Sequence, residues 1–254
     1  AGEFRVALVP EVLPPLLKAG VEILLEPGAG VGAGFPDQAY REQGASLAAS
    51  RADLFARADL VLQVRTFGAN SDAGRQDLQA VRAEQILVGL CEPLTAFREN
   101  LALSEAGVTL FALELMPRIT RAQGMDVLSA MATLAGYKAV LMAAAELPRI
   151  FPLMMTAAGT LTPARVLVIG AGVAGLQAIA TARRLGAVVQ AYDLRPAVKE
   201  QVESLGARFV DLGLDTSASE DAGGYATAQD EEFYRRQRDA LGEVVADSDV
   251  VITT

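Results

Sequence analysis

The chain has 254 residues, of which 52% are hydrophobic and 21% charged, and its formal net charge is -9. This composition excludes a disordered chain and predicts a folded protein long enough for two domains. The acidic balance argues against a nucleic-acid partner, because phosphates are bound by lysine and arginine surfaces.

Two residue types that carry much chemistry are scarce. The chain has no histidine and a single cysteine, Cys91. These counts exclude a Ser-His-Asp triad, a histidine-based zinc site, a thiolate cluster and an internal disulfide. We therefore expect no metal site, and the lone cysteine indicates a reducing, cytoplasmic compartment. We see no secretory signal and expect no membrane span, because the longest apolar stretch, from Leu134, is interrupted by charged residues and Pro148.

Short apolar runs alternate with amphipathic segments over the first 115 residues. The apolar runs predict strands at 21–27, 59–65, 85–91 and 108–114. The segments between them predict helices at 11–20, 36–44, 50–58 and 93–107. Alternating strands and helices indicate a parallel sheet covered by helices.

Residues 126–147 predict one long helix, because they are rich in the strong helix formers Ala, Leu and Met. Asp126 could cap its start, and Pro148 would stop it. The segment 151–164 then leads into a second α/β series. We predict an N-terminal α/β domain over residues 1–128 and a second, Rossmann-type domain over 129–254.

The second series opens with a glycine pattern between a strand and a helix. A predicted strand at 165–169 is followed by Gly170, Gly172 and Gly175 in the spacing G-x-G-x-x-G, then by a helix and a strand that ends at Asp193. In a dinucleotide-binding turn the first glycine permits the tight bend, the second lets a pyrophosphate approach, and the third lets the helix pack on the strand. We predict dinucleotide binding; the alternative is a structural glycine turn in a nucleotide-free domain.

Asp193 favours NAD over NADP. A carboxylate at this place accepts hydrogen bonds from the ribose hydroxyls of NAD, whereas the additional phosphate of NADP would meet like charge. Arg195 complicates this choice, because a cation there could accommodate that phosphate. The predicted cofactor contacts are Gly170, Ala171, Gly172, Val173, Ala174, Gly175, Asp193, Leu194 and Arg195.

A long polar segment precedes the last predicted strand. Residues 211–233 exceed the usual length of a connection, which indicates either a lid or a solvated surface loop. The strand within 248–254 has no helix after it. We therefore expect the doubly wound domain to be incomplete at its C-terminal end.

Several stretches together resemble the NAD-binding component (domain I, the N-terminal part of the alpha subunit) of the proton-translocating NAD(P) transhydrogenases. They are RVALVPE (5–11), PRITRAQGMD (117–126), AGYKAV (135–140), the glycine region 156–187, AGGYA (222–226) and DVVITT (249–254). Alanine dehydrogenase is a more distant resemblance. The resemblance implies two doubly wound Rossmann-like parallel-sheet domains separated by a cleft, with the chain truncated at both ends.

The resemblance also implies an activity and partners. The family exchanges hydride reversibly between NAD(H) on this component and NADP(H) on a separate component, coupled to proton translocation by a membrane component. The enzyme would be an NAD(P)+ transhydrogenase, of the Si-specific type. The implied assembly is a homodimer in the cytoplasm, held at the inner (plasma) membrane through its partner subunits.

The same resemblance assigns roles to a polar segment and to one aromatic residue. Asp126 and Ser129 would hold the nicotinamide carboxamide, Arg118 would contact the nicotinamide end, and Gln123 would reach toward the partner's NADP. Tyr225 would belong to a loop that closes over NAD. By residue type alone, Asp126 is also a candidate helix cap and Arg118 a candidate for a surface ion pair.

Two other functions remain open. An amino-acid dehydrogenase of the alanine type needs a proton acceptor and a cation near the substrate carbonyl, which that family supplies by histidine and lysine. Here Gln63 and Arg65 occupy the neighbourhood of the lysine, and Glu92 would have to serve as the base. The other alternative is a non-catalytic NAD-sensing subunit that only binds a partner.

Overall fold

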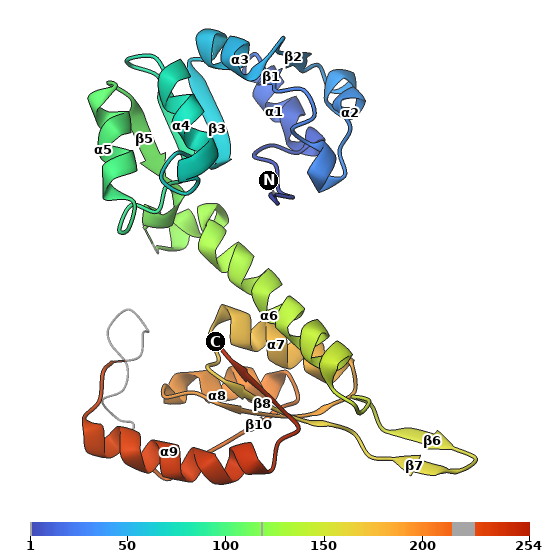
Figure 1. Cartoon of the computed structure of the whole chain (residues 1–254). Coiled ribbons are helices and arrows are strands. Elements are labelled where there is room, and N and C mark those ends of the chain that lie inside the picture. Colours follow the sequence, from blue (N-terminus) through green and yellow to red (C-terminus); the bar gives the residue numbers. More distant parts are fainter. Residues whose placement is uncertain (1, 118, 215–226) are drawn as a thin grey trace. The chain divides into compact units, whose positions relative to one another are not determined.

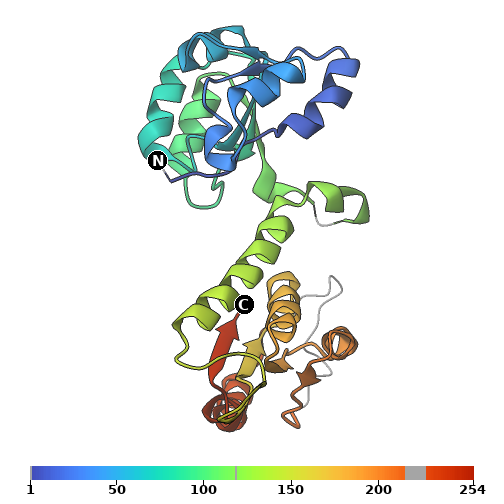
Figure 2. The same cartoon turned by 90° about the vertical axis from the view of Figure 1, so that its right-hand side faces the viewer.

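The computed structural model describes residues 2–117, 119–214 and 227–254. The chain divides into two compact units, Ala1–Val127 (unit 1) and Leu128–Thr254 (unit 2). Both units are α/β structures with parallel sheets, which confirms the predicted fold class (Figures 1 and 2). Each unit is described separately below.

Unit 1 contains two small parallel sheets. One pairs β1 (Leu24–Leu25) with β2 (Ser46–Leu47), and the other has the order β3 (Leu60–Arg65), β4 (Ile86–Leu90), β5 (Thr109–Ala112). The α-helices of unit 1 are α1 (Leu13–Lys18), α2 (Asp37–Glu42), α3 (Arg51–Arg57), α4 (Ser71–Ala80) and α5 (Phe97–Glu105). Short 3-10 helices are η1 (Pro10–Val12), η2 (Val31–Ala33), η3 (Leu113–Leu115) and η4 (Thr120–Met125).

The core of unit 1 forms where helices cover the sheet of three strands. Phe55 of α3, Leu87 of β4 and Leu103 of α5 are almost fully buried in one cluster. An ion pair with one buried partner lies beside it: the exposed Arg51 of α3 donates from Nε and Nη2 to the buried Asp77 of α4, at 2.6 and 2.8 Å. Burying a charge is costly unless it is paired, so this bidentate pair ties α3 to α4.

Unit 2 is built on one parallel sheet with the order β10-β9-β8-β11. Its strands are β8 (Arg165–Ile169), β9 (Val188–Tyr192), β10 (Arg208–Phe209) and β11 (Val250–Thr253). Its helices are α6 (Val127–Glu146, from the last residue of unit 1), α7 (Val173–Arg184), η5 (Pro196–Val198), α8 (Lys199–Ser204) and α9 (Glu231–Ala246). Because β8 lies between β9 and β11, the chain leaves β8 toward one side of the sheet and later returns to its other side, as in a Rossmann fold.

The helix α6 packs on the core of unit 2 through small residues. Val140 is fully buried in that core, and Ala139, Ala143 and Ala144 pack against it. By length and composition α6 is the one helix of the described residues that could cross a membrane, and 11% of its apolar stretch is buried. Contact with the core therefore accounts for only part of its apolar surface, since Leu134 is 57% exposed.

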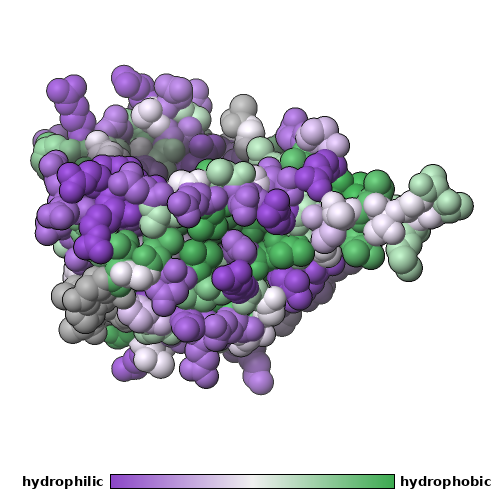
Figure 3. Space-filling model, turned by 90° about the horizontal axis from the view of Figure 1, so that it is seen from below, coloured by the Kyte–Doolittle hydropathy of each residue, from purple (hydrophilic) through white to green (hydrophobic). Residues whose placement is uncertain are grey.

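A β-hairpin separates α6 from the sheet of unit 2. The strands β6 (Met154–Thr156) and β7 (Gly159–Leu161) pair with each other in antiparallel register. Their side chains are exposed, including Met155 at 79%, and the hairpin projects from the unit as a pale green and white arm (Figure 3). The sequence reasoning treated residues 151–164 as a connection and missed this hairpin.

The structure differs from the predicted elements at other places. Helix α4 and strand β2 were not predicted, and α9 begins at Glu231, inside the segment expected to be a polar loop. The helix expected at 126–147 is α6, which ends at Glu146, two residues before Pro148. Strand β2 has only two residues and α4 is mostly polar, so neither leaves a clear apolar pattern in the sequence.

Candidate functional site

The glycine pattern forms a turn between β8 and α7, at the carboxyl end of the sheet of unit 2. The amide of Gly170 donates to the carbonyl of Tyr192 at 2.8 Å, which joins the turn to the end of β9. Gly172 is the N-cap residue of α7, and the helix begins at Val173. The turn therefore places the start of a 12-residue helix directly after the central strand.

The structure requires a glycine at two of the three positions. Gly170 has a φ of +96°, and a Cβ there would lie 2.5 Å from the carbonyl oxygen of Thr254. A Cβ on Gly175 would lie 1.8 Å from the carbonyl oxygen of Gly170, so a side chain would push α7 away from the turn. Gly172 has an ordinary extended conformation, and a Cβ there would meet nothing within 4 Å.

Among the three glycines of the pattern, Gly172 is thus the one that packing does not explain. Its open face lies at the start of α7, where the first amide groups of a helix have no partner within the helix. Such amides and the helix dipole favour a negative group in front of them. A backbone without a side chain at this place allows a phosphate to come close.

Asp193 follows β9 and is buried, with 7% of its surface exposed. Its Oδ2 accepts a hydrogen bond from the amide of Ala171 at 2.7 Å, so the carboxylate lies against the glycine turn. Burial alone would raise the pKa of Asp193, but hydrogen bonds from Arg195 and from the amide of Ala171 outweigh it and lower that pKa below its ordinary value. The carboxylate is therefore ionised at neutral pH.

Leu194 and Arg195 continue from Asp193 and are half-buried. The Arg195 guanidinium forms an ion pair with the Asp193 carboxylate at 2.9 Å. The predicted cofactor contacts of unit 2, residues 170–175 and 193–195, are thus brought together by the ends of β8 and β9.

The residues expected at the nicotinamide end lie around the start of α6. Gln123 is exposed in η4, and Asp126 follows η4 directly; both belong to unit 1. Ser129 lies in the first turn of α6, in unit 2, where its carbonyl accepts a hydrogen bond from Thr133 at 3.0 Å. Arg118 and Tyr225 lie outside the described residues.

The residues of the amino-acid dehydrogenase alternative lie in unit 1, and each has a partner within the protein. Gln63 donates to Asp77 at 2.9 Å, and the Arg65 guanidinium lies 3.2 Å from the Glu3 carboxylate. Glu92 is exposed, and its amide donates to Glu114 at 2.8 Å. The side chains of Gln63 and Arg65 are thus held by carboxylates of the same unit.

Two residues that the sequence reasoning did not single out support the glycine turn. A Cβ on Gly136 would lie 2.0 Å from the carbonyl oxygen of Ala174, so α6 crosses close to the first turn of α7. The hydroxyl of Thr254 donates to the carbonyl of Gly170 at 3.0 Å. A glycine inside a helix otherwise rich in Ala and Leu was the signal for the first contact.

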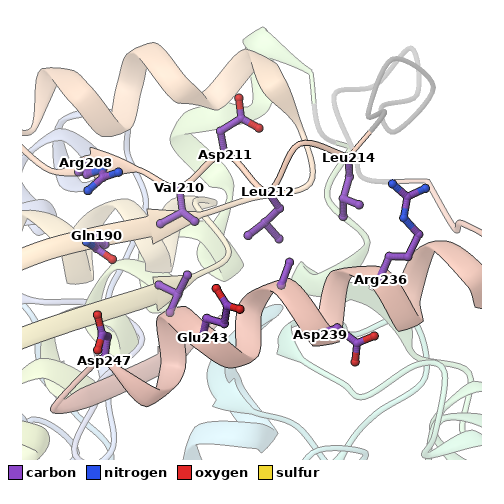
Figure 4. A pocket seen from close by; sticks show the side chains of 12 residues that line it. Gln190, Arg208, Val210, Asp211, Leu212, Leu214, Arg236, Asp239, Glu243 and Asp247 are labelled. Carbon is purple, nitrogen blue, oxygen red and sulfur yellow. The ribbon is translucent and has the colours of Figure 1, made fainter.

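A separate hollow of about 740 Å³ lies between α9 and the β9–β10 side of the sheet (Figure 4). Its wall combines two arginines with four carboxylates and apolar residues: Arg208, Arg236, Asp211, Asp239, Glu243, Asp247, Gln190, Val210, Leu212, Leu214, Ala240 and Val244. None of the residues of the glycine turn lines it. In the portion of the chain that the structure describes, no group of three His, Cys, Asp or Glu side chains could hold a metal ion.

Comparisons with known proteins match both halves of the chain. Residues 1–135 match the model described as "Alanine dehydrogenase/PNT, N-terminal domain", and residues 139–254 match that of the corresponding C-terminal domain. An NAD(P) transhydrogenase alpha-subunit protein of Rhodospirillum rubrum is 47% identical over the whole chain, which spans 66% of that relative. The alanine dehydrogenase of Mycobacterium tuberculosis is 32% identical over 76% of the chain and 50% of its own length.

Among solved structures, the transhydrogenase from Sinorhizobium meliloti superimposes with a TM-score of 0.84 at 45% identity. The match covers 99% of this chain and 66% of that one. The chain therefore spans less than two thirds of the length of these relatives. With both domain models matched in order along the sequence, the chain belongs to the alanine dehydrogenase/PNT family.

Proposed function

We propose that the chain is the NAD(H)-binding component of a proton-translocating transhydrogenase. It would exchange hydride between NAD(H) bound here and NADP(H) bound on a partner component. The observation that carries this proposal is the glycine turn, where Gly172 leaves an open approach to the start of α7 that no packing contact explains. The printed names of the relatives in Rhodospirillum rubrum and Sinorhizobium meliloti support the same activity.

The residues present fit a dinucleotide. The amides at the start of α7 would bind the diphosphate, and the ionised Asp193 would accept hydrogen bonds from the ribose hydroxyls. A carboxylate beside that ribose disfavours a 2′-phosphate, which supports NAD rather than NADP in this unit. We assign Asp126 and Ser129 to the carboxamide, Arg118 to the nicotinamide end, Gln123 to the partner's NADP and Tyr225 to closure over NAD.

The chemistry needs positioning more than acid or base groups. A bound NADH supplies a hydride, which carries two electrons and the proton together to the ring of NADP+. No side chain has to accept or donate a proton in that exchange, so a chain without histidine can support it. Holding two reactants in a reactive orientation can account for several kcal/mol of the barrier.

The proposal includes an assembly. We propose a homodimer that associates with an NADP-binding component and a membrane component that conducts protons. The chain would then lie on the cytoplasmic side of the inner membrane and be held there through its partners. The Si-specific stereochemistry expected from the resemblance belongs to this proposal and can be read from deuterium-labelled NADH.

One experiment distinguishes this function from its alternatives. The full-length protein is mixed with its NADP-binding partner, NADH and an NADP analogue, and separately with NAD and alanine. We expect hydride exchange in the first mixture and none in the second. Turnover of alanine would contradict the proposal in favour of an amino-acid dehydrogenase, and no reaction in either mixture would favour a sensing subunit.

A Gln123→Ala variant tests the role assigned to the polar segment. We expect hydride exchange to slow by about tenfold or more, because positioning of the partner's ring is lost while the NADH contacts remain. NADH affinity, measured by calorimetry, should change little. Gln38→Ala is the matched control, because it removes an exposed glutamine from α2 of the same unit. A large loss of NADH binding with normal exchange once NADH is bound would refute this role.

A further inference from the structure

The Asp193 carboxylate already accepts four hydrogen bonds. Oδ1 accepts from the amide and from Nε of Arg195, at 2.8 and 2.9 Å. Oδ2 accepts from the amide of Ala171 and from Nη2 of Arg195, at 2.7 and 2.9 Å. An ionised carboxylate offers about four acceptor positions on its two oxygens. The four donors therefore fill the usual capacity of this side chain.

The four donors are of two kinds. Two are backbone amides, which the glycine turn and the chain after β9 hold in place. The other two are the parallel N–H groups of one guanidinium, one directed at each oxygen. Only the second pair can leave by a side-chain rotation that does not disturb the backbone.

The guanidinium pair has the same pattern as a ribose diol. Adjacent hydroxyl groups present two neighbouring donors to the two oxygens of a carboxylate, as Nε and Nη2 of Arg195 do here. The ribose contact assigned to Asp193 needs those acceptor positions. The two donor pairs therefore exclude each other at this carboxylate.

We propose that Arg195 determines nucleotide specificity by occupying the ribose-diol position on Asp193 and leaving it when the dinucleotide binds. This inference rests on the proposed NAD(H) binding by unit 2. The displaced guanidinium stays close to the ribose, because Arg195 is two residues from Asp193 and its own amide remains bound to that carboxylate. There it supplies a positive charge to a 2′-phosphate.

Arg195 thus acts in opposite directions on the two coenzymes. It competes with the hydroxyls of NADH for Asp193, and it partly offsets the repulsion between Asp193 and the phosphate of NADPH. If the Arg195 contact occupies Asp193 in most molecules, only the remaining fraction is ready to bind NADH. The apparent affinity for NADH is then reduced in proportion to that fraction. Removing the guanidinium should therefore raise the affinity for NADH and lower the affinity for NADPH.

Calorimetry on the full-length protein tests this with NADH and NADPH. For Arg195→Ala we expect NADH to bind about threefold or more tightly than wild type, and NADPH to bind more weakly. Arg195→Lys keeps the charge but cannot form the two parallel bonds, so NADH should again bind more tightly while NADPH affinity is kept. Arg184→Ala removes an exposed arginine from the far end of α7 and should change neither affinity.

The Arg195→Lys variant is less prone to misfold than Arg195→Ala, because Asp193 keeps a neighbouring cation. Thermal melting of both variants checks that they are folded. Unchanged or weaker NADH binding by folded Arg195→Ala and Arg195→Lys would overturn the proposal that the ribose displaces Arg195 from Asp193. In that case wild type still binds NADH and the proposed function stands. A wild-type protein that binds no NADH would overturn the proposed function and this inference together.

Discussion

At the scale of single residues, the candidate site depends on a few backbone positions and one carboxylate. Gly170 and Gly175 are explained by a positive φ and by a close approach within the turn, whereas no packing contact requires a glycine at 172. Residue type and spacing were sufficient to identify the three glycines and Asp193 as candidate cofactor contacts. They could not predict that the Arg195 guanidinium is bound to the Asp193 carboxylate, because this contact depends on the side-chain rotamer of Arg195.

An Asp193→Ala variant should bind NADH about tenfold more weakly. The loss corresponds to roughly one charge-assisted hydrogen bond, because exchange with Arg195 already offsets part of the ribose contact. The affinity for NADPH should fall less, since the carboxylate that repels its 2′-phosphate is also gone. Titration calorimetry with both coenzymes measures this. Equal NADH affinity in the variant and the wild type would refute the assignment of Asp193 to the ribose.

At the scale of elements, α6 packs closely against the first turn of α7, next to the glycine turn. Gly136 lets the backbone of α6 approach Ala174, in the first turn of α7. The Ala, Leu and Met content of residues 126–147 predicted α6, and a short apolar run predicted β8. Neither signal marks the hairpin β6–β7 or the polar helix α4, since the hairpin strands have three residues each and α4 lacks an apolar face of useful length.

Gly136→Ala should destabilise the protein, although alanine is the better helix former. The new Cβ would lie 2.0 Å from the carbonyl oxygen of Ala174, and overpacking of this kind costs about 1–3 kcal/mol. Thermal melting should show a lower Tm. Gly242→Ala on α9 is the matched control, because its Cβ meets nothing within 4 Å and should stabilise by about 0.5–1 kcal/mol. A gain of stability in both variants would contradict the close contact.

At the scale of the whole molecule, two α/β units belong to one family, and the chain spans 66% of its Rhodospirillum rubrum relative. The fold class could be predicted because strands and helices alternate regularly, whereas the family was predicted from a resemblance of several stretches between residues 5 and 254. The assembly could not be derived in the same way. The proposed contacts with a second copy and with a membrane component would involve surfaces that need have no periodic pattern in this chain.

The most direct test of the account is a crystal structure of the full-length protein with NADH bound. We predict electron density for the diphosphate against the amides at the start of α7, above Gly172, and for the ribose on Asp193. Density for the diphosphate at any other place in the protein, with the glycine turn free of ligand, would contradict the account.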